Sequence, residues 1–323
     1  MNSLLRQVED SILRFMKDHP HAPKDLYAPV DYMLGLGGKR MRPLLVLLAH
    51  GMFSKRAKNA IPAALAMELF HNFTLVHDDI MDKAVLRRNK TTVHKKWNDN
   101  VAILSGDVML VYAYRELGKV DKRYLPEALE LFSRTAAEVC EGQQMDMDFE
   151  KRNDVRISDY LRMIELKTAV LLGACLQTGA ILGGAGKKDA KALYEFGKNT
   201  GIAFQLMDDL LDAYGDEKIF GKQKGGDILA NKKTFLSLNA LERAGVKERK
   251  KVAGILFSSS VDAAGKIEQV LHTYDRLNVR EHTESMMKRY YSFALKHLET
   301  VKVPSPAKVP LLQVASLLLD RKK

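Results

Sequence analysis

The chain has 323 residues, 46% of them hydrophobic, and a formal net charge of +11. It can therefore bury a large core, and its basic excess suits nucleic acid, an anionic membrane or a polyanionic small molecule. The charged N-terminus lacks an apolar segment, so no secretory signal is expected. The longest aliphatic run, residues 44–49, is far below the ~20 residues that cross a bilayer. Two cysteines, Cys140 and Cys175, argue against disulfides or a zinc site and predict the cytoplasm.

Helical periodicity dominates the chain, and sustained strand alternation is absent from the sequence. In chain order, helices are predicted over residues 3–18, 28–52, 63–82, 101–117, 125–150, 157–184, 189–213, 234–245, 248–257, 260–273, 279–299 and 311–319. Short glycine- or proline-marked loops, including residues 35–38, separate many of them and indicate antiparallel neighbours. We predict an all-α protein: one large orthogonal or antiparallel helical bundle, a single domain over residues 1–323.

Two aspartate clusters with the pattern D-D-x-x-D lie inside apolar helices. Asp78 and Asp82 are four residues apart and share a helical face, as do Asp208 and Asp212. Like charges at this spacing repel, and a hard divalent cation reverses the sign of that interaction. Two carboxylates per helix, with sites left for water and phosphate, are typical of Mg²⁺ bound between protein and a diphosphate. A solvated helix end is the alternative, but the apolar flanks disfavour it.

A basic segment follows each aspartate cluster. Residues 83–96 carry six cations and no acid, and residues 218–233 carry five lysines and one aspartate. A third segment, G-G-K-R-M-R-P at residues 37–43, joins a glycine turn to three cations. Arginine and lysine beside metal-binding carboxylates commonly hold phosphate groups. Nucleic acid is the competing partner, but aromatic residues are only 7% and the sequence has no stacking platform or zinc finger.

These motifs resemble those of the trans-isoprenyl diphosphate synthases (polyprenyl synthetases), and the resemblance covers nearly the whole chain. Further matching motifs are F-H-N-F-T-L-V-H-D-D-I-M-D (70–82), R-R-N-K-T-T-V-H (87–94), S-G-D (105–107), E-G-Q-Q-M-D (141–146), L-K-T-A (166–169), F-Q-L-M-D-D-L-L-D (204–212) and G-K-Q-K-G-G-D-I-L-A-N-K-K-T (221–234). The resemblance implies an isoprenoid synthase fold with a central apolar cavity. It also implies a homodimer that joins isopentenyl diphosphate to dimethylallyl, geranyl or farnesyl diphosphate, without nucleic acid or stable membrane insertion.

The resemblance also assigns roles to matching residues. Three Mg²⁺ ions would be coordinated by Asp78, Asp82 and Asp208. Support, directly or through water, would come from Asp79, Asp209 and Asp212. The allylic diphosphate would be held by these ions and by Arg87, Lys167, Lys222 and Lys232. The diphosphate of isopentenyl diphosphate would be held by Lys39, Arg42, His71 and Arg88. Thr168 and Gln205 would line the reacting carbons.

The implied chemistry needs no nucleophilic side chain. Mg²⁺ and the cations would stabilise the charge on departing pyrophosphate, so the allylic C–O bond could ionise. The double bond of isopentenyl diphosphate would then attack, and a proton would be lost. A class I terpene cyclase is an alternative, disfavoured by the second D-D-L-L-D motif and by G-G-K-R. A non-catalytic subunit of a heteromeric synthase is another, disfavoured because both aspartate clusters are whole.

Three residues before the first aspartate cluster are candidates for setting the product length. Phe73 lies five residues before Asp78, ~7.5 Å along a helix axis; Thr74 is adjacent and Phe70 lies about a turn deeper. In the family, an aromatic residue at the position of Phe73 is typical of short-chain synthases, and in this feature the chain resembles them. We expect a C20 product ahead of C15, with a longer chain as the alternative.

Three segments depart from the family pattern or leave a role open. Residues 89–90, Asn-Lys, replace a glycine and a small residue. Residues 231–233, Asn-Lys-Lys, leave the register of the second lysine open. The basic tail, residues 321–323, matches a segment that folds over the diphosphates in some relatives, while a disordered tail is the alternative.

Overall fold

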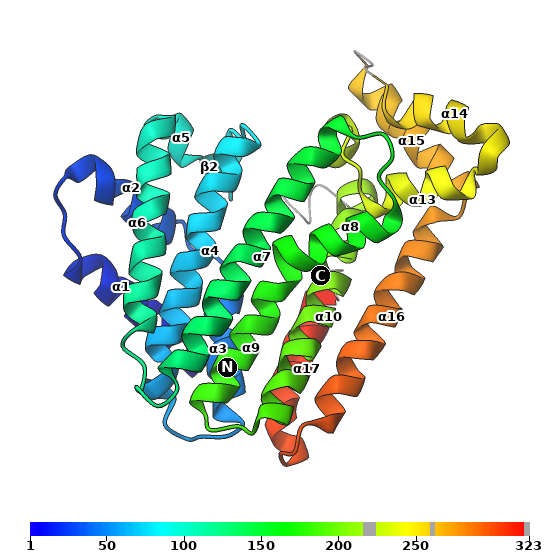
Figure 1. Cartoon of the computed structure of the whole chain (residues 1–323). Helices are drawn as coiled ribbons and strands as arrows, with labels where there is room; N and C mark the ends of the chain where they lie inside the picture. Colours follow the sequence, from blue (N-terminus) through cyan, green and yellow to red (C-terminus); the bar gives the residue numbers. More distant parts are fainter. Residues whose placement is uncertain (216–223, 259–261, 320–323) are drawn as a thin grey trace. The chain divides into compact units, whose positions relative to one another are not determined.

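The computed structural model describes residues 1–215, 224–258 and 262–319, and these residues are almost entirely helical (Figure 1). The chain divides into two compact units. Unit 1 comprises Met1–Arg134, Ala174–Tyr194 and Val301–Leu311. Unit 2 comprises Thr135–Gly173, Glu195–Thr300 and Leu312–Lys323. The single domain over residues 1–323 stays a prediction.

The elements follow the predicted helical periods closely. Unit 1 contains α1 (Asn2–Asp18), α2 (Lys24–Gly35), α3 (Met41–Gly51), the 3₁₀ helix η1 (Ala57–Ala60), α4 (Ile61–Met81), strands β1 (Leu86–Arg87) and β2 (Lys90–Thr91), α5 (Val93–Lys96) and α6 (Asp99–Leu117). Unit 2 contains α8 (Ile157–Ile164), the π-helix η2 (Glu165–Ala169), α12 (Gly226–Leu229), α13 (Phe235–Arg243), α14 (Gly245–Leu256), α15 (Ala263–Arg276) and α16 (Val279–Thr300). Four of the five boundaries between the units fall inside α7 (Leu125–Lys151), α9 (Val170–Leu182), α10 (Lys187–Tyr214) and α17 (Ser305–Leu319), and the fifth follows the end of α16.

Helix α4 is the central element of unit 1 and carries the first aspartate cluster at its C-terminal end. Proline occupies its first turn, where a missing N–H costs nothing. Its side chains are buried on several faces, and it packs against α6, α3 and α1. A helix that is apolar on several sides belongs in an interior. Because most of α4 is buried, its last turn is the part that can present carboxylates to a ligand.

The pattern over residues 28–52 divides into two helices where one was predicted. Gly37 and Gly38 have φ angles of 69° and 134°, values that L side chains rarely adopt. Arg40 caps α3 with a φ of 45°. The helix is thus interrupted over residues 37–40, and the three cations of this segment lie just before α3 and in its first turn.

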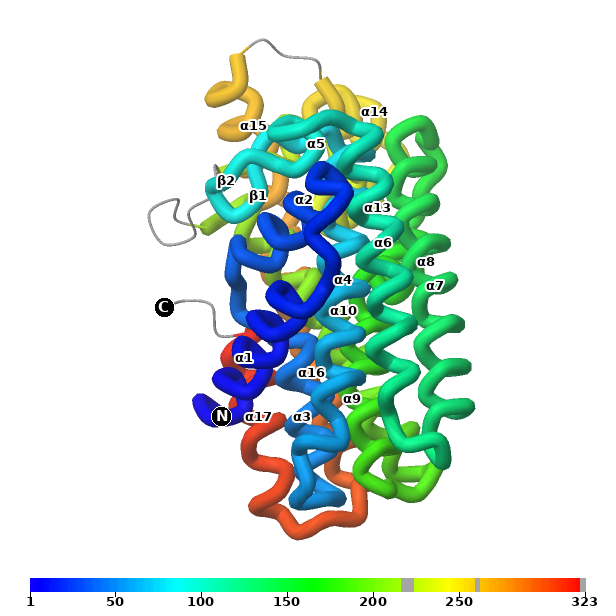
Figure 2. Tube along the Cα trace, turned by 90° about the vertical axis from the view of Figure 1, so that its left-hand side faces the viewer, coloured from blue at the N-terminus to red at the C-terminus, as the bar shows by residue number. Residues whose placement is uncertain are grey.

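A short hairpin, β1–β2, follows α4 and pairs Arg87 with Lys90. Its two turn residues, Arg88 and Asn89, have φ angles of 52° and 59°, as a type I′ turn requires. Asparagine tolerates this left-handed region better than most residues, so Asn89 can stand where the family commonly has glycine. The hairpin lies beside α2 and α5 (Figure 2), and the Tyr32 hydroxyl donates to the Thr91 carbonyl at 2.7 Å.

The core of unit 2 gathers buried side chains from α8, α13, α14, α15 and the second half of α10. Helix α13 packs against α8, α14, α15 and α16. Between α8 and α9 the helix widens into the π-helix η2, which contains Lys167 and Thr168. Such π segments are rare and frequently mark functional sites.

One continuous helical stretch among the described residues, Ile157–Leu182, is long and apolar enough to span a membrane. However, 78% of its most apolar window is buried inside the protein. Core helices of globular proteins meet the same length and apolarity criteria, so this stretch is weak evidence for a membrane span.

We expect Gly179→Ala to destabilise the protein, because a Cβ at Gly179 would lie 2.1 Å from the Val46 carbonyl oxygen. Overpacking of this kind costs about 1–3 kcal/mol of unfolding free energy. Gly254→Ala is the matched control: it lies in α14 with no atom near its added Cβ, so it should raise stability by up to ~1 kcal/mol. Urea denaturation followed by circular dichroism measures both. Equal midpoints for the two variants would contradict the close helix contact.

Candidate active site

In unit 1, Arg87 bridges two carboxylates of the first aspartate cluster. Its guanidinium nitrogens lie 2.7 Å and 2.8 Å from Asp79 Oδ1 and 3.3 Å from Asp78 Oδ2. Asp79 is buried, Asp78 half-buried and Asp82 exposed at the C-terminal cap of α4. Burial raises the pKa of Asp79, while the Arg87 hydrogen bonds oppose the rise. Asp79 is therefore paired with Arg87, which fits a role in supporting the metal-binding aspartates.

Next to Arg87, Arg88 folds back against the glycine turn. Its Nη1 donates to the Gly37 carbonyl oxygen. A Cβ added at Gly38 would lie 2.8 Å from the Arg88 guanidinium carbon, and the φ of 134° at this position also favours glycine. The structure thus brings together two motifs that are separated by fifty residues, and it explains why the turn before the cations consists of glycines.

Arg42 and His71 complete this cationic region of unit 1. Arg42 Nη1 lies 2.9 Å from His71 Nε2. Burial, together with Arg42 and Arg88, lowers the pKa of His71 well below its usual range. The ring is therefore neutral near pH 7, and its Nε2 can accept the hydrogen bond from Arg42. The Arg42 Nε is buried without a hydrogen-bond partner, which favours an anionic ligand at this position. Lys39 is exposed in the same turn.

Arg40, between Lys39 and Arg42 in sequence, has a different role. Its guanidinium is buried and lies 2.7 Å from Glu68 and 2.9 Å from Glu9, and it donates to the Leu34 carbonyl at 2.7 Å. Sequence reasoning did not identify Glu68 or Glu9. A glutamate on the apolar face of α4 was a signal that some cation must pair with it. Arg40 is thus a structural ion pair and leaves its neighbours to meet a ligand.

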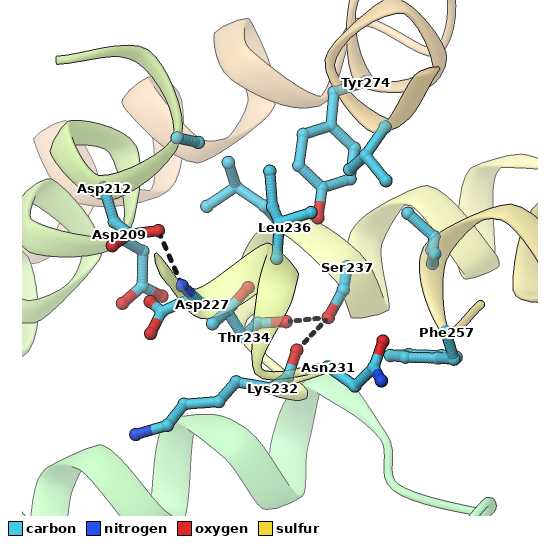
Figure 3. A pocket seen from close by; sticks show the side chains of 14 residues that line it. Asp209, Asp212, Asp227, Asn231, Lys232, Thr234, Leu236, Ser237, Phe257 and Tyr274 are labelled. Carbon is cyan, nitrogen blue, oxygen red and sulfur yellow. Dashed lines mark hydrogen bonds between the residues drawn. The ribbon is translucent and has the colours of Figure 1, made fainter. Parts of the chain in front are cut away.

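In unit 2, the second aspartate cluster lies near the end of α10, beside α12. Asp212 Oδ2 accepts from the Asp227 N–H at 3.0 Å, and the Asp212 carbonyl accepts from the Gly225 N–H at 2.7 Å. Figure 3 shows Asp209, Asp212 and Asp227 gathered on one side of a pocket, with Phe257 and Tyr274 on the other. These contacts join the lysine-rich segment to the aspartate helix. Asp208 is half-buried on the same helix.

Asp209 is buried and surrounded by donors. The Tyr160 hydroxyl donates to Asp209 Oδ2, while Gln205 Nε2 and the Phe235 N–H donate at 3.3 Å and 3.4 Å. Burial and the charge of Asp227 raise the pKa of Asp209 well above its usual range. Sequence reasoning did not identify Tyr160, whose hydroxyl comes from α8. Asp209, like Asp79, is the second aspartate of its D-D-x-x-D motif, and other groups of the protein hydrogen-bond to both.

Lys167 forms an ion pair with Asp146, the last residue of the motif E-G-Q-Q-M-D, for which the sequence predicted no role of its own. Its Nζ lies 2.7 Å from Asp146 Oδ2 on α7. A Cβ at Gly142 would lie 2.2 Å from the Lys167 amide nitrogen, so the π-helix η2 and α7 touch through backbone atoms. A cavity of about 120 Å³ is lined by four residues that the family resemblance assigned to substrate, namely Lys167, Thr168, Gln205 and Lys232. Asp209, which the resemblance assigned to metal support, also lines it, together with Asp146 and Asp227.

The structure distinguishes the two lysines that the sequence left in uncertain register. Lys233 Nζ donates to the Phe149 carbonyl at 2.6 Å, at the end of α7. Lys232 extends along the pocket beneath the aspartates in Figure 3. Lys232 is therefore the lysine placed beside the carboxylates. Lys222 and the basic tail at 321–323 lie outside the described residues.

Comparisons with known proteins agree with this geometry. Residues 23–274 match the sequence profile of the polyprenyl synthetase family. The chain belongs to the polyprenyl synthetases. It is 37% identical to the geranylgeranyl diphosphate synthase of Methanosarcina mazei, with 93% of this chain and 90% of that protein covered. The all-α fold, the family and the class of enzyme, a trans-prenyltransferase, are thereby confirmed.

Two solved structures are similar over nearly their whole length. A geranylgeranyl pyrophosphate synthase crystal structure superposes with a TM-score of 0.91 at 45% identity, covering 99% of each chain. The geranylgeranyl pyrophosphate synthase of Corynebacterium glutamicum, complexed with isoprenyl diphosphate and magnesium, gives a TM-score of 0.86 at 27% identity, covering 98% of each chain. These likenesses place the helices of this polyprenyl synthetase in the isoprenoid synthase fold. The central cavity stays a prediction.

In this polyprenyl synthetase, the aromatic residues expected to set product length form a contiguous stack in unit 1. The ring centroids of Phe73 and Phe70 lie 5.7 Å apart, and those of Phe70 and Phe132 lie 5.3 Å apart. Thr74 does not join the stack, because its hydroxyl donates to the His71 carbonyl at 2.8 Å. Phe73 also meets the His77 ring edge-on at 4.7 Å.

We expect Asp146→Asn to lower kcat/KM for the allylic substrate by about tenfold, because Lys167 would no longer be held in one geometry. Steady-state kinetics with the allylic diphosphate as the varied substrate measure this. Asp148→Asn is the matched control, since Asp148 is exposed on the same helix and accepts only from Gln144 among its described hydrogen bonds. Equal kinetics for the two variants would show that the Lys167–Asp146 pair does not position substrate.

Proposed function

We propose that this chain condenses isopentenyl diphosphate head to tail with an allylic diphosphate, and that geranylgeranyl diphosphate is its main product, ahead of farnesyl diphosphate. The observation that carries this proposal is the cationic region around Gly37 and Gly38. There, Arg42, His71 and Arg88 converge beside an arginine that is bound to the first aspartate cluster. A terpene cyclase, which binds a single diphosphate, has no use for this second set of cations.

We propose Mg²⁺ as the cofactor, three ions per site. The donor set fits a hard cation, because it consists of carboxylates on two helices. Asp78 and Asp82 lie at the C-terminal end of α4, where the helix dipole further disfavours uncompensated negative charge. The relative from Corynebacterium glutamicum was solved with magnesium and isoprenyl diphosphate, which supports the assignment. The bound ions would stabilise charge on the departing pyrophosphate.

Each group of residues has a defined task under this proposal. Lys39, Arg42, His71 and Arg88 would bind the diphosphate of isopentenyl diphosphate. Arg87, Lys167 and Lys232, with Lys222, would bind the allylic diphosphate. Asp78, Asp82 and Asp208 would be the primary metal ligands, and Asp212 would contribute or act through water. Asp79 and Asp209 would fix the orientation of their neighbours through Arg87 and Tyr160. Thr168 and Gln205 would face the reacting carbons.

We further propose a cytoplasmic homodimer. Cys140 and Cys175 are both free thiols, in keeping with a reducing compartment. Helix α6 exposes a row of large apolar side chains, Ile103, Leu104 and Val111. Exposed apolar faces of this kind commonly mark a protein interface.

The direct test combines purified protein, labelled isopentenyl diphosphate and each allylic primer in turn, with products sized by chromatography. We expect a C20 product that requires Mg²⁺ and is lost with chelator. Asp78→Ala and Asp208→Ala should each lower turnover by at least about a thousandfold while helicity is retained. Asp10→Ala, an exposed aspartate on α1, is the matched control. No prenyl product with any primer would refute the proposal.

Phe73→Ala should lengthen the main product, because it removes a ring from the aromatic stack five residues before Asp78. The measurement is the chain-length distribution under single-primer conditions. Phe53→Ala is the matched control, because it removes an equal side chain at a half-buried position after α3, next to Gly183, and it should leave chain length unchanged. An unchanged distribution for Phe73→Ala would mean that another residue terminates the product.

A further inference from the structure

A second group of metal-ligating side chains lies in unit 1, where α1 ends and α2 begins. His19 is the C-cap of α1, His21 lies in the connecting loop, and Asp31 lies on α2. One ligand atom from each of the three lies within 4.8 Å of the other two. His19 Nε2 is 2.7 Å from Asp31 Oδ1, and His21 Nδ1 is 4.0 Å from Asp31 Oδ2. None of these residues belongs to the active site described above.

The hydrogen bonds of His19 determine where its ring proton lies. His19 Nδ1 is 2.6 Å from the Pro20 carbonyl oxygen. A carbonyl oxygen only accepts, so Nδ1 must be the donor. The neutral ring then has a lone pair on Nε2, which points at a carboxylate oxygen 2.7 Å away. A lone pair and a carboxylate repel at this distance unless a proton lies between them or a metal ion binds both.

We propose that His19, His21 and Asp31 bind a borderline divalent transition metal ion such as Zn²⁺. Metal-ligating histidines commonly donate their other ring N–H to a backbone carbonyl, as His19 does here. Zinc–ligand bonds of about 2.0–2.1 Å in a tetrahedral site place neighbouring ligand atoms roughly 3.4 Å apart. The observed 2.7 Å and 4.0 Å lie on either side of that value. To close the site, the Asp31 carboxylate moves roughly 0.7 Å away from His19 Nε2 and the exposed His21 ring moves toward Asp31.

The surrounding side chains hold the buried His19 ring rigidly, whereas the His21 ring is accessible to solvent. The His19 ring stacks on Tyr27 at 5.2 Å and meets Phe15 at the same distance, and its side chain is 1% exposed. The His21 side chain is 64% exposed, so an ion can enter from solvent. Three protein ligands leave a fourth position for water. Imidazole nitrogens favour zinc, cobalt or nickel over magnesium, so this site differs in chemistry from the aspartate clusters.

Occupancy would connect the end of α1 to α2 and so stabilise unit 1. An ion that binds only the folded chain raises its stability by mass action, by a factor set by its concentration relative to the dissociation constant. The consequence is independent of catalysis, because none of the three residues is assigned to substrate or Mg²⁺. The test therefore stands or fails separately from the proposed prenyltransferase activity.

The experiment titrates metal-free full-length protein with Zn²⁺ in excess Mg²⁺ by calorimetry, and with Co²⁺ by visible absorption. We expect one Zn²⁺ per chain, a raised melting temperature, and the absorption bands of four-coordinate Co²⁺. His21→Ala removes an exposed ring, so the fold should be retained, and its affinity should fall at least about tenfold. Asp31→Asn should weaken binding likewise. His272→Ala, an exposed histidine on α15, is the matched control and should bind as wild type.

Two outcomes would overturn the proposal. Absence of Zn²⁺ binding under these conditions would mean that His19 and Asp31 contact each other directly, without a metal ion. Equal Zn²⁺ affinity in wild type, His21→Ala and Asp31→Asn would place any bound ion elsewhere. Loss of the Co²⁺ bands in both variants but not in His272→Ala would support the assigned ligands.

Discussion

The fork that Arg87 makes across Asp78 and Asp79 is the interaction on which the geometry of unit 1 depends. It offsets the repulsion between adjacent carboxylates at the end of α4 and holds the β1–β2 hairpin against that helix. Removing one partner of a buried ion pair typically costs about 3–5 kcal/mol, because the other charge stays uncompensated. Since Arg88 is the next residue, the same fork also determines where the second arginine lies.

The turn of the β1–β2 hairpin places a second arginine, Arg88, next to Arg87 and so adds to the positive charge of the site. Arg88 and Asn89 both adopt positive φ, which carries the Arg88 side chain back to the Gly37 carbonyl. Left-handed backbone at a non-glycine residue costs roughly 1–3 kcal/mol and persists where surrounding contacts enforce it. Here the Arg87 fork and the glycine turn enforce it from two sides. The strain thus coincides with the residue that would bind isopentenyl diphosphate.

Unit 2 handles its buried carboxylate in a different way. Within the part of the chain that the structure describes, Asp209 has no arginine partner and instead accepts hydrogen bonds from the neutral donors of Tyr160, Gln205 and Phe235. Burial and the charge of Asp227 raise the pKa of Asp209 well above its usual range, so protonation can relieve this carboxylate where Arg87 compensates Asp79 in unit 1.

The helices and both aspartate clusters could be predicted from the sequence, because helical periodicity and short i, i+4 spacing are local properties. The break between α2 and α3 was missed as an element boundary, although its glycines were visible, because apolar periodicity continues on both sides. Long-range partners were inaccessible in principle. Glu68 signalled a buried charge, but only the fold shows that Arg40, 28 residues away, is its partner. Tyr160 gave no local signal, because its importance lies in a hydrogen bond to a residue 49 positions later.

The aromatic rings next to Phe73 are packed too tightly to be pushed aside, which favours a rigid limit on the length of the product. Phe70 lies behind Phe73, and Phe132 contacts Phe70 edge-on while packing against Tyr114 at 4.9 Å. Phe70 and Phe132 are almost fully buried, so their rings cannot swing away to accommodate a growing hydrocarbon without opening a cavity elsewhere. A protein interior with this density resists gradual expansion. Removal of one ring should therefore open only the space that this ring filled, because the next ring is held in place by its own buried contacts.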